Sequence, residues 1–316
     1  MAEYHGRRRR AEKMTPFRVV VTVVVVLAVA FGALRFIPGS PLAADSVARW
    51  GHTANTRAPG TEAPPASRSG RPSPSPSPSP ALPPLDIASA NVKVDTSGWW
   101  SWAMQDTRTG KISGSANMAE TNTTASLIKS WIAADFLRRS AEQGTTPSST
   151  RMEQVRVMIR DSDNDAAQSL WKVVGQSKSI GRLIHICKLT DSSAYKNLWS
   201  NTRLSPRDIT RLGACIADGR AAGPKWTNHL LKEMRAVRGV GTFGIRKAFP
   251  AEEQPSIAIK NGWVDRQATQ EYHVSCLAIG DGWTVGVMAR YPIRLDYTHG
   301  AKICESVGEQ LLAAAT

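Results

Sequence analysis

Ser126 and Lys129 could together form the nucleophile and base of an acyl-transfer site. They stand three residues apart at the start of an apolar helical pattern, so their side chains share one face of the expected helix. A serine hydroxyl is a weak nucleophile until a base removes its proton. A lysine can act as that base where burial or nearby cations lower its pKa. The same pair could instead be a helix cap and a solvated lysine, and Ser-x-x-Lys occurs three times in the chain.

Two further segments decide between these interpretations. Residues 162–164 read Ser-Asp-Asn directly after an apolar helical pattern, and residues 260–262 read Lys-Asn-Gly within an alternating, strand-like run. Taken alone, the first could be a helix cap and the second could carry an ordinary exposed lysine. Only the Ser-x-x-Lys copy at Ser126 precedes both segments. The order of the three elements therefore favours a catalytic constellation.

The three elements resemble those of the class A β-lactamases and penicillin-binding transpeptidases, whose patterns are Ser-x-x-Lys, Ser-Asp-Asn and Lys-Thr-Gly. The resemblance covers roughly residues 95–315. It implies a serine hydrolase that needs no metal or cofactor and forms an acyl-enzyme with a β-lactam or a peptidoglycan peptide. The alternative is a catalytically silent module that uses the same cleft to bind peptidoglycan or a partner.

The resemblance also assigns a role to each residue of the expected site. Ser126 is the nucleophile, Lys129 is its base, and Ser162 passes a proton to the leaving nitrogen. On the substrate-binding side, Asn164 holds the amide of the substrate, Lys260 attracts its carboxylate, Asn261 and Gly262 continue the binding strand, and the N–H groups of Ser126 and Trp263 form the oxyanion hole.

The chain departs from the family pattern at three points. Asn261 stands where the family has threonine, and Trp263 stands where a small residue is usual. Class A β-lactamases also use a loop carboxylate to activate the water that releases the acyl group. Between Asp165 and Asp208 this chain has one acidic residue, Asp191. We therefore expect acylation with slow deacylation, with Asp191 as the one candidate for a substitute base.

The periodicity of the chain predicts an α+β fold, with an antiparallel sheet flanked by helices and an all-helical subdomain. A hairpin is expected over residues 99–117, around Thr109-Gly110, and strands are expected over 255–264 and 271–291, with Asp281-Gly282 as a tight turn. Helices are expected over residues 127–139, 152–160, 165–174, 179–187, 205–217 and 299–315.

The N-terminal part has a different composition. Residues 1–15 are basic, and residues 16–37 form an apolar run with Arg18 and Arg35 near its ends. This pattern predicts a cytoplasmic N-terminus and a single-pass signal-anchor in the cell membrane, with the C-terminal domain outside. A cleaved signal peptide is the alternative, and it would leave a secreted protein.

Residues 38–86 are rich in proline and serine and are expected to be a disordered linker to the domain at 87–316. The net charge of +14 includes the basic N-terminus. No basic stripe with interleaved aromatic residues indicates nucleic acid as a partner.

The four cysteines suggest two disulfides in an oxidising compartment. Of the three possible pairings we favour Cys187–Cys215 and Cys276–Cys304, because each pair lies in neighbouring elements. No Cys-x-x-Cys or clustered histidine pattern indicates a metal site.

Overall fold

The computed structural model describes residues 92–195 and 198–315. The expected cytoplasmic segment, anchor and linker lie outside these residues. Within them, no helix is long and apolar enough to cross a membrane.

The strands are β1 (Trp99–Asp106), β2 (Ile112–Gly114), β3 (Asn122–Thr123), β4 (Arg203–Leu204), β5 (Ala258–Arg266), β6 (Glu271–Gly280) and β7 (Trp283–Pro292). The α-helices are α2 (Lys129–Glu142), α3 (Ser149–Arg160), α4 (Asn164–Val173), α5 (Ser177–Cys187), α6 (Pro206–Ala217), α7 (Thr227–Arg235) and α8 (Asp296–Ala315). Short 3₁₀ turns are η3 (Ala125–Ile128), η4 (Trp199–Asn201), η5 (Gly239–Thr242), η6 (Ile245–Ala248), η7 (Gln254–Ser256) and η8 (Ile293–Leu295).

Five strands form one antiparallel sheet in the order β2-β1-β7-β6-β5. The expected hairpin before the serine is β1–β2, and the expected tight turn at Asp281-Gly282 joins β6 to β7. Gly110 and Gly282 each adopt a positive φ at these turns, a conformation that glycine allows without steric cost. β5, which carries residues 260–262, is an edge strand.

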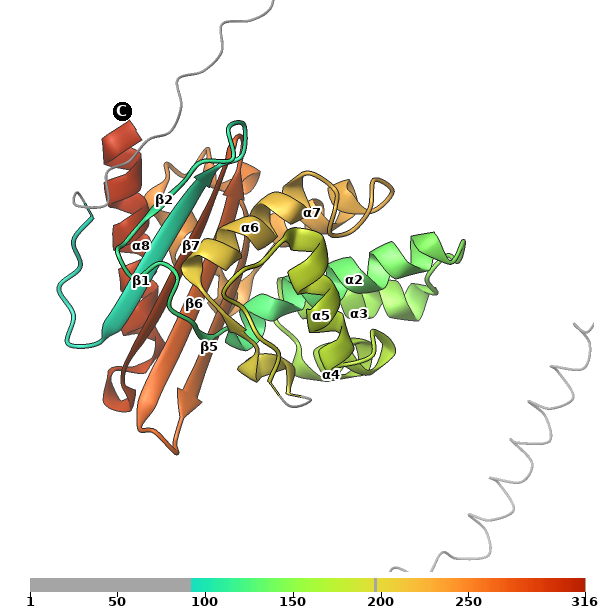
Figure 1. Cartoon of the computed structure of the whole chain (residues 1–316), viewed down its shortest axis with the longest axis horizontal. Coiled ribbons are helices and arrows are strands. Elements are labelled where there is room, and N and C mark those ends of the chain that lie inside the picture. Colours follow the sequence, from blue (N-terminus) through green and yellow to red (C-terminus); the bar gives the residue numbers. More distant parts are fainter. Residues whose placement is uncertain (1–91, 196–197, 316) are drawn as a thin grey trace, which may run out of the picture. The chain divides into compact units, whose positions relative to one another are not determined.

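Helices cover both faces of the sheet, with α8 on one side and the helical block on the other (Figure 1). The alternation of side chains along β6 determines which residues meet which layer. Cys276 forms a disulfide with Cys304 of α8, whereas Leu277 packs toward Gly213 of α6. The sheet is thus buried on both faces, and the predicted α+β fold class is confirmed.

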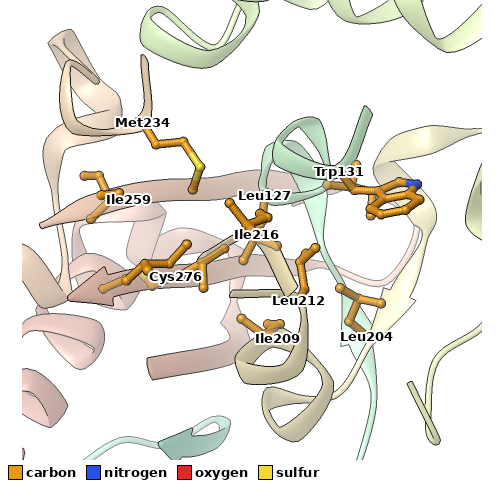
Figure 2. Packing of buried hydrophobic residues seen from close by; sticks show 14 of the residues in the cluster. Leu127, Trp131, Leu204, Ile209, Leu212, Ile216, Met234, Ile259 and Cys276 are labelled. Atoms are coloured by element: carbon orange, nitrogen blue, oxygen red, sulfur yellow. The ribbon is translucent and has the colours of Figure 1, made fainter. Parts of the chain in front are cut away.

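A hydrophobic core joins the sheet to the helical block. Leu127, Ile209, Leu212, Ile216 and Ile259 are fully or almost fully buried there, and side chains from η3, α6 and β5 meet (Figure 2). Helix α2 is central to the block and is buried on nearly every side. The segment that contains Ser126 is therefore held by packing at its C-terminal end.

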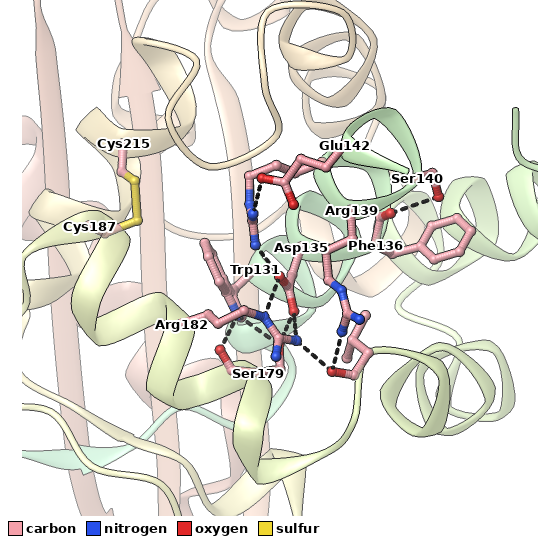
Figure 3. Close-up of polar contacts among 12 residues, drawn as sticks. Trp131, Asp135, Phe136, Arg139, Ser140, Glu142, Ser179, Arg182, Cys187 and Cys215 are labelled. Carbon is pink, nitrogen blue, oxygen red and sulfur yellow. Dashed lines mark hydrogen bonds and ion pairs between the residues drawn. A yellow bond between two sulfur atoms is a disulfide. The ribbon is translucent and has the colours of Figure 1, made fainter. Parts of the chain in front are cut away.

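The helical block also contains a buried polar network around Asp135 of α2 (Figure 3). Its carboxylate accepts hydrogen bonds from Arg138 at 2.5 Å and from Ser179 at 2.6 Å, and Arg182 adds an ion pair. Trp131 donates to both oxygen atoms of Ser179 at 3.0 Å. Because a buried carboxylate without such partners would be costly, this network fixes α5 against α2.

Both predicted disulfides are confirmed. Cys187–Cys215 joins α5 to α6, and Cys276–Cys304 joins β6 to α8.

Two features of the nucleophile region differ from the expected elements. The expected helix at residue 127 begins as a 3₁₀ turn, and α2 itself starts at Lys129. The two-residue strands β3 and β4 were not expected, because strands this short give no periodic signal. They pair with each other and thereby bring the loop before α6 beside the nucleophile turn.

Candidate active site

Ser126 lies in the second position of the 3₁₀ turn between β3 and α2. Its side chain is partly exposed, while Ala125 and Leu127 on either side are buried. Ala125 has φ 45°, a left-handed conformation that costs a non-glycine residue of order 1–3 kcal/mol. The turn is held by the Thr124 carbonyl, which accepts from Ser275 Oγ at 2.6 Å and from the Leu127 N–H at 3.1 Å. Ser126 is thus the one partly exposed residue of a turn whose other residues are buried.

Lys129 is fully buried beneath this turn. Its Nζ donates to the Ser162 carbonyl at 2.5 Å and to Asn164 Oδ1 at 2.7 Å, and lies 3.4 Å from Ser162 Oγ. Burial lowers the pKa of Lys129 to about 7, although Asp163 opposes the shift. The ammonium can therefore lose its proton near neutral pH. Among the described residues its hydrogen bonds go to Ser162 and Asn164, and none joins it to the Ser126 hydroxyl.

Lys260, on β5, also contacts Ser162. It is fully buried, and its Nζ donates to Ser162 Oγ at 3.0 Å and to the Asn261 carbonyl at 3.2 Å. Burial, and then the charge of Lys129, lower the pKa of Lys260 well below its usual value. Ser162 itself has φ 59°, a strained backbone conformation. One hydroxyl thus lies within reach of two buried amines, an arrangement suited to moving protons.

Gly262 brings β5 against the nucleophile turn. A Cβ at this position would lie 2.2 Å from the Thr124 carbonyl oxygen and 2.7 Å from the backbone nitrogens of Ser126 and Leu127. Only glycine allows this approach of two backbones. Trp263 is the next residue of β5 after this point of contact.

The structure places the Asn261 amide elsewhere than expected. Asn261 is buried, and its Nδ2 donates to the carbonyls of Gly241 at 3.0 Å and Phe243 at 2.6 Å. Neighbouring residues of a strand point to opposite sides, so Lys260 and Asn261 cannot both face the cleft. Asn261 instead anchors the η5 loop. Trp263 is partly exposed and meets Phe243 edge to face, with centroids 5.6 Å apart.

Trp199 is a site residue that the sequence reasoning missed. Its ring lies over the ammonium of Lys129, 4.8 Å from nitrogen to centroid, and its Nε1 donates to Gln168 Oε1 at 3.2 Å. An aromatic ring thus contacts Lys129 from the segment between Asp165 and Asp208, where the resemblance predicts a carboxylate. The only available signal was an aromatic residue in a polar loop.

Asp191 is held in a different network. Its carboxylate pairs with Arg207 at 2.7 Å and accepts from Ser205 Oγ at 2.7 Å. Burial alone would raise the pKa of Asp191, but the hydrogen bonds from Arg207, Ser205 and Thr190 outweigh it and lower the pKa. This ion pair ties the loop to the start of α6 and leaves a weak base. In the described parts of the chain, no three metal-binding side chains cluster together.

A known protein family matches the C-terminal part of the chain. A family model described as the beta-lactamase enzyme family matches residues 146–315. The chain belongs to this family. The matched segment contains Ser162, Asn164 and Lys260 but begins after Ser126 and Lys129, so the placement of these two rests on the structure.

Solved structures of the beta-lactamase fold resemble the chain closely in shape and weakly in sequence. A structure titled PBP-A has a TM-score of 0.58 at 16% identity, covering 74% of this chain and 98% of that one. A beta-lactamase from Chitinophaga pinensis has a TM-score of 0.56 at 16% identity, covering 70% and 95%. One from Sphaerobacter thermophilus gives 0.55 at 15% identity, covering 70% and 92%. At these identities the likeness establishes the fold.

Curated relatives include the "Putative lipoprotein LppW" of Mycobacterium tuberculosis and of Mycobacterium bovis. Each is 27% identical over 188 residues, which are 57% of this chain and 59% of the relative. The match therefore spans about three fifths of the length of these relatives.

Proposed function

We propose that this protein is a membrane-attached, extracytoplasmic serine hydrolase that forms an acyl-enzyme with β-lactams or cell-wall peptides and releases the acyl group slowly. The observation that carries the proposal is the position of Ser162. Its hydroxyl lies 3.0 Å from Lys260 Nζ and 3.4 Å from Lys129 Nζ, and Lys129 follows the partly exposed Ser126 by three residues. Acyl transfer from an amide needs a base for the nucleophile and an acid for the leaving nitrogen, and a hydroxyl between two buried amines can carry protons between these roles.

In the proposed reaction the neutral amine of Lys129 takes the proton of Ser126 as the serine oxygen attacks the substrate carbonyl. The negative charge that develops on the carbonyl oxygen is held by the N–H groups of Ser126 and Trp263. The carbon–nitrogen bond then breaks, and Ser162 donates its proton to the leaving nitrogen. Lys129 returns a proton to Ser162 through the contact already present, which completes the balance.

Two residues orient the substrate in this proposal. Asn164 is exposed and shares its Oδ1 with Lys129, so its Nδ2 is available to the amide of the substrate. Lys260 is the proposed partner of the carboxylate that β-lactams and peptide C-termini carry, and binding of that anion would favour the charged form of its buried amine.

Slow release of the acyl group follows from what surrounds Lys129. Hydrolysis of the ester needs a base to activate water, and the loop contact of Lys129 is the ring of Trp199. The carboxylate of Asp191 is paired with Arg207. A long-lived acyl-enzyme is therefore expected, and β-lactams should act as inhibitors.

Attachment to the membrane is supported by two observations. The N-terminal sequence has a basic segment followed by an apolar run, and the curated relatives carry the name lipoprotein. Single-pass anchoring through residues 16–37 is the form we propose for this chain.

Labelling with a fluorescent penicillin tests the proposal. The wild-type protein should become covalently fluorescent, and Ser126→Ala should not. Ser169→Ala is the matched control, because Ser169 and Lys172 repeat the Ser-x-x-Lys spacing within α4. Equal labelling of the wild type and Ser126→Ala would refute the assignment of the nucleophile.

One feature favours the second candidate, a silent module that binds peptidoglycan without reaction. Lys129 donates to Ser162 and Asn164 and leaves the Ser126 hydroxyl without a bonded base in the described part of the chain. A correctly folded protein that binds peptidoglycan fragments but is never labelled would establish this alternative.

A further inference from the structure

A cavity of about 690 Å³ lies beside the nucleophile turn. Its wall includes Thr123, three residues before Ser126, and Asp265, two residues after Trp263. Two residues of an extended strand span about 7 Å, so the cavity begins roughly that far along β5 from Trp263. Residues from the loop before β4, among them Asn201, close the other side.

Three arginines line this cavity, namely Arg203, Arg266 and Arg290. Among the described residues none of them forms an ion pair with a carboxylate, although many other arginines of the chain do. Arg203 is committed to Thr121, donating to its hydroxyl at 3.1 Å and its carbonyl at 2.6 Å. Arg290 stacks over Trp99, with Cζ 5.5 Å from the ring centroid. These contacts are with neutral groups. Because no carboxylate of the described residues forms an ion pair with the three arginines, their positive charges can attract an anion.

Arg266 has a buried polar atom without a partner, which a ligand in the cavity could satisfy. Its Nη2 donates to the Ser200 carbonyl at 3.1 Å, but its Nε is buried without a partner. The Oδ1 of Asn201, in the same wall, is also buried without a partner. Unpaired buried polar atoms are unfavourable, and a ligand bearing an acceptor and an N–H donor would satisfy both of them.

The two acidic residues of the cavity wall, Asp265 and Glu271, each contact a neighbouring side chain. Asp265 accepts from Gln267 at 2.8 Å, and Glu271 Oε2 lies 3.3 Å from Nε2 of His273. His273 Nδ1 contacts Thr123 Oγ1 at 2.7 Å. Burial lowers the pKa of His273, and Arg266 and Arg290 lower it further against the opposing effect of Glu271. The imidazole is thus mostly neutral at pH 7, and the three arginines outnumber the two carboxylates of the cavity wall, so its net charge is positive.

We propose that this cavity binds a carboxylate carried by the acyl portion of the substrate. The inference rests on the proposed function and names the substrate class more closely: acyl donors with an acidic side chain. The direction of β5 supports it. Lys260 precedes Trp263 along the strand and is proposed to bind the leaving-group part of the substrate, whereas the cavity lies after Trp263. A substrate lying along the strand therefore places its acyl end in the cavity.

A pair of thioesters tests the proposal. Both have the same mercaptoacetate leaving group, and the acyl residue is N-acetylglutamyl in one and N-acetylglutaminyl in the other. Ser126 Oγ attacks the thioester carbonyl, the carbon–sulfur bond breaks, and the thiol leaves with the proton relayed through Ser162. The burst of thiol and the mass of the acylated protein report the acylation rate. The glutamyl thioester should react about tenfold faster, as expected for one charge-assisted hydrogen bond.

Variants separate the cavity from the catalytic centre. Arg266→Gln and Arg290→Gln should each reduce the glutamyl-to-glutaminyl rate ratio toward one. Arg294→Gln is the control, because this exposed arginine lies in η8 outside the cavity wall and should leave the ratio unchanged. Thermal melting checks that the Ser200 loop remains folded in Arg266→Gln, and Arg290→Gln supplies an independent result.

The two proposals can fail separately. A protein that is acylated by penicillin but shows no preference for the glutamyl thioester, or whose preference survives both arginine changes, would refute the cavity proposal alone. A folded protein that reacts with neither penicillin nor the thioesters would refute both.

Discussion

Gly262 lies so close to Ser126 that a Cβ on the glycine would come within 2.7 Å of the serine backbone nitrogen. The edge strand and the nucleophile turn are thus in direct backbone contact. This contact sets the distance between the two N–H groups proposed for the oxyanion hole, those of Ser126 and Trp263. The architecture of the candidate site therefore depends on the absence of a side chain at Gly262.

Gly262→Ala should separate β5 from the nucleophile turn. The methyl group would also meet the Thr124 carbonyl at 2.2 Å, so the backbones must shift. We expect the rate of acylation by penicillin to fall by about 10²-fold or more, as when one oxyanion donor is lost. Gly181→Ala in α5, where a Cβ meets no atom within 4 Å, is the control and should react normally. Normal acylation by a well-folded Gly262→Ala protein would count against this role of the strand.

Lys129→Met should slow acylation by roughly 10²–10⁴-fold, because it removes the general base. The pH profile supplies a second readout. The base must be neutral, and the pKa of Lys129 is lowered to about 7, so the wild-type rate should rise from pH 6 to 8 and then level off. Lys172→Met, in the exposed Ser-x-x-Lys copy, should behave as wild type. A rate that still rises up to pH 10 would mean that Lys129 has an ordinary pKa.

Trp199→Glu should shorten the lifetime of the acyl-enzyme. The change places a carboxylate in the loop that contacts Lys129, where it can activate water. Trp199→Gln is the matched control, since it removes the ring without adding a base. We expect release at least about tenfold faster in Trp199→Glu than in Trp199→Gln, measured by loss of the adduct mass with time. Equal lifetimes in the two variants would show that the missing carboxylate does not limit release.

Removal of the disulfide between β6 and α8 should destabilise the protein without removing the site. Both disulfides join residues 28 apart in sequence. The chain-entropy relation assigns each about 3–4 kcal/mol to the free energy of unfolding. Cys276→Ala with Cys304→Ala, and Cys187→Ala with Cys215→Ala, should therefore show similar losses in denaturant unfolding. A loss below about 1 kcal/mol for either pair would contradict the relation for this chain.

The sequence predicted the elements that repeat a pattern. The long strands β6 and β7 alternate apolar residues, and each cysteine pair lies in elements that pack together. The turn at Asp281-Gly282 carries its own chemical signal. Local propensity and tertiary packing agree at these places, so these elements of the fold could be predicted from the sequence.

The parts of the site that escaped prediction depend on contacts between distant segments. Trp199 contacts Lys129 from the turn just before β4, which pairs with β3, and neither of these two-residue strands has a periodic signal. The orientation of Asn261 could have been found, since it follows Lys260 on a strand and must point the other way. The cavity is assembled from four separate segments of the chain, which no local motif reveals.

The central claim is that Ser126 forms a persistent acyl-enzyme. Intact-protein mass spectrometry after brief exposure to benzylpenicillin tests it most directly. The account predicts that the wild-type mass increases by that of one penicillin, that peptide mapping places the adduct on Ser126, and that the adduct survives for many minutes. Rapid consumption of penicillin without an adduct would contradict slow release, and an adduct on another residue, or none at any concentration on folded protein, would contradict Ser126 as the nucleophile.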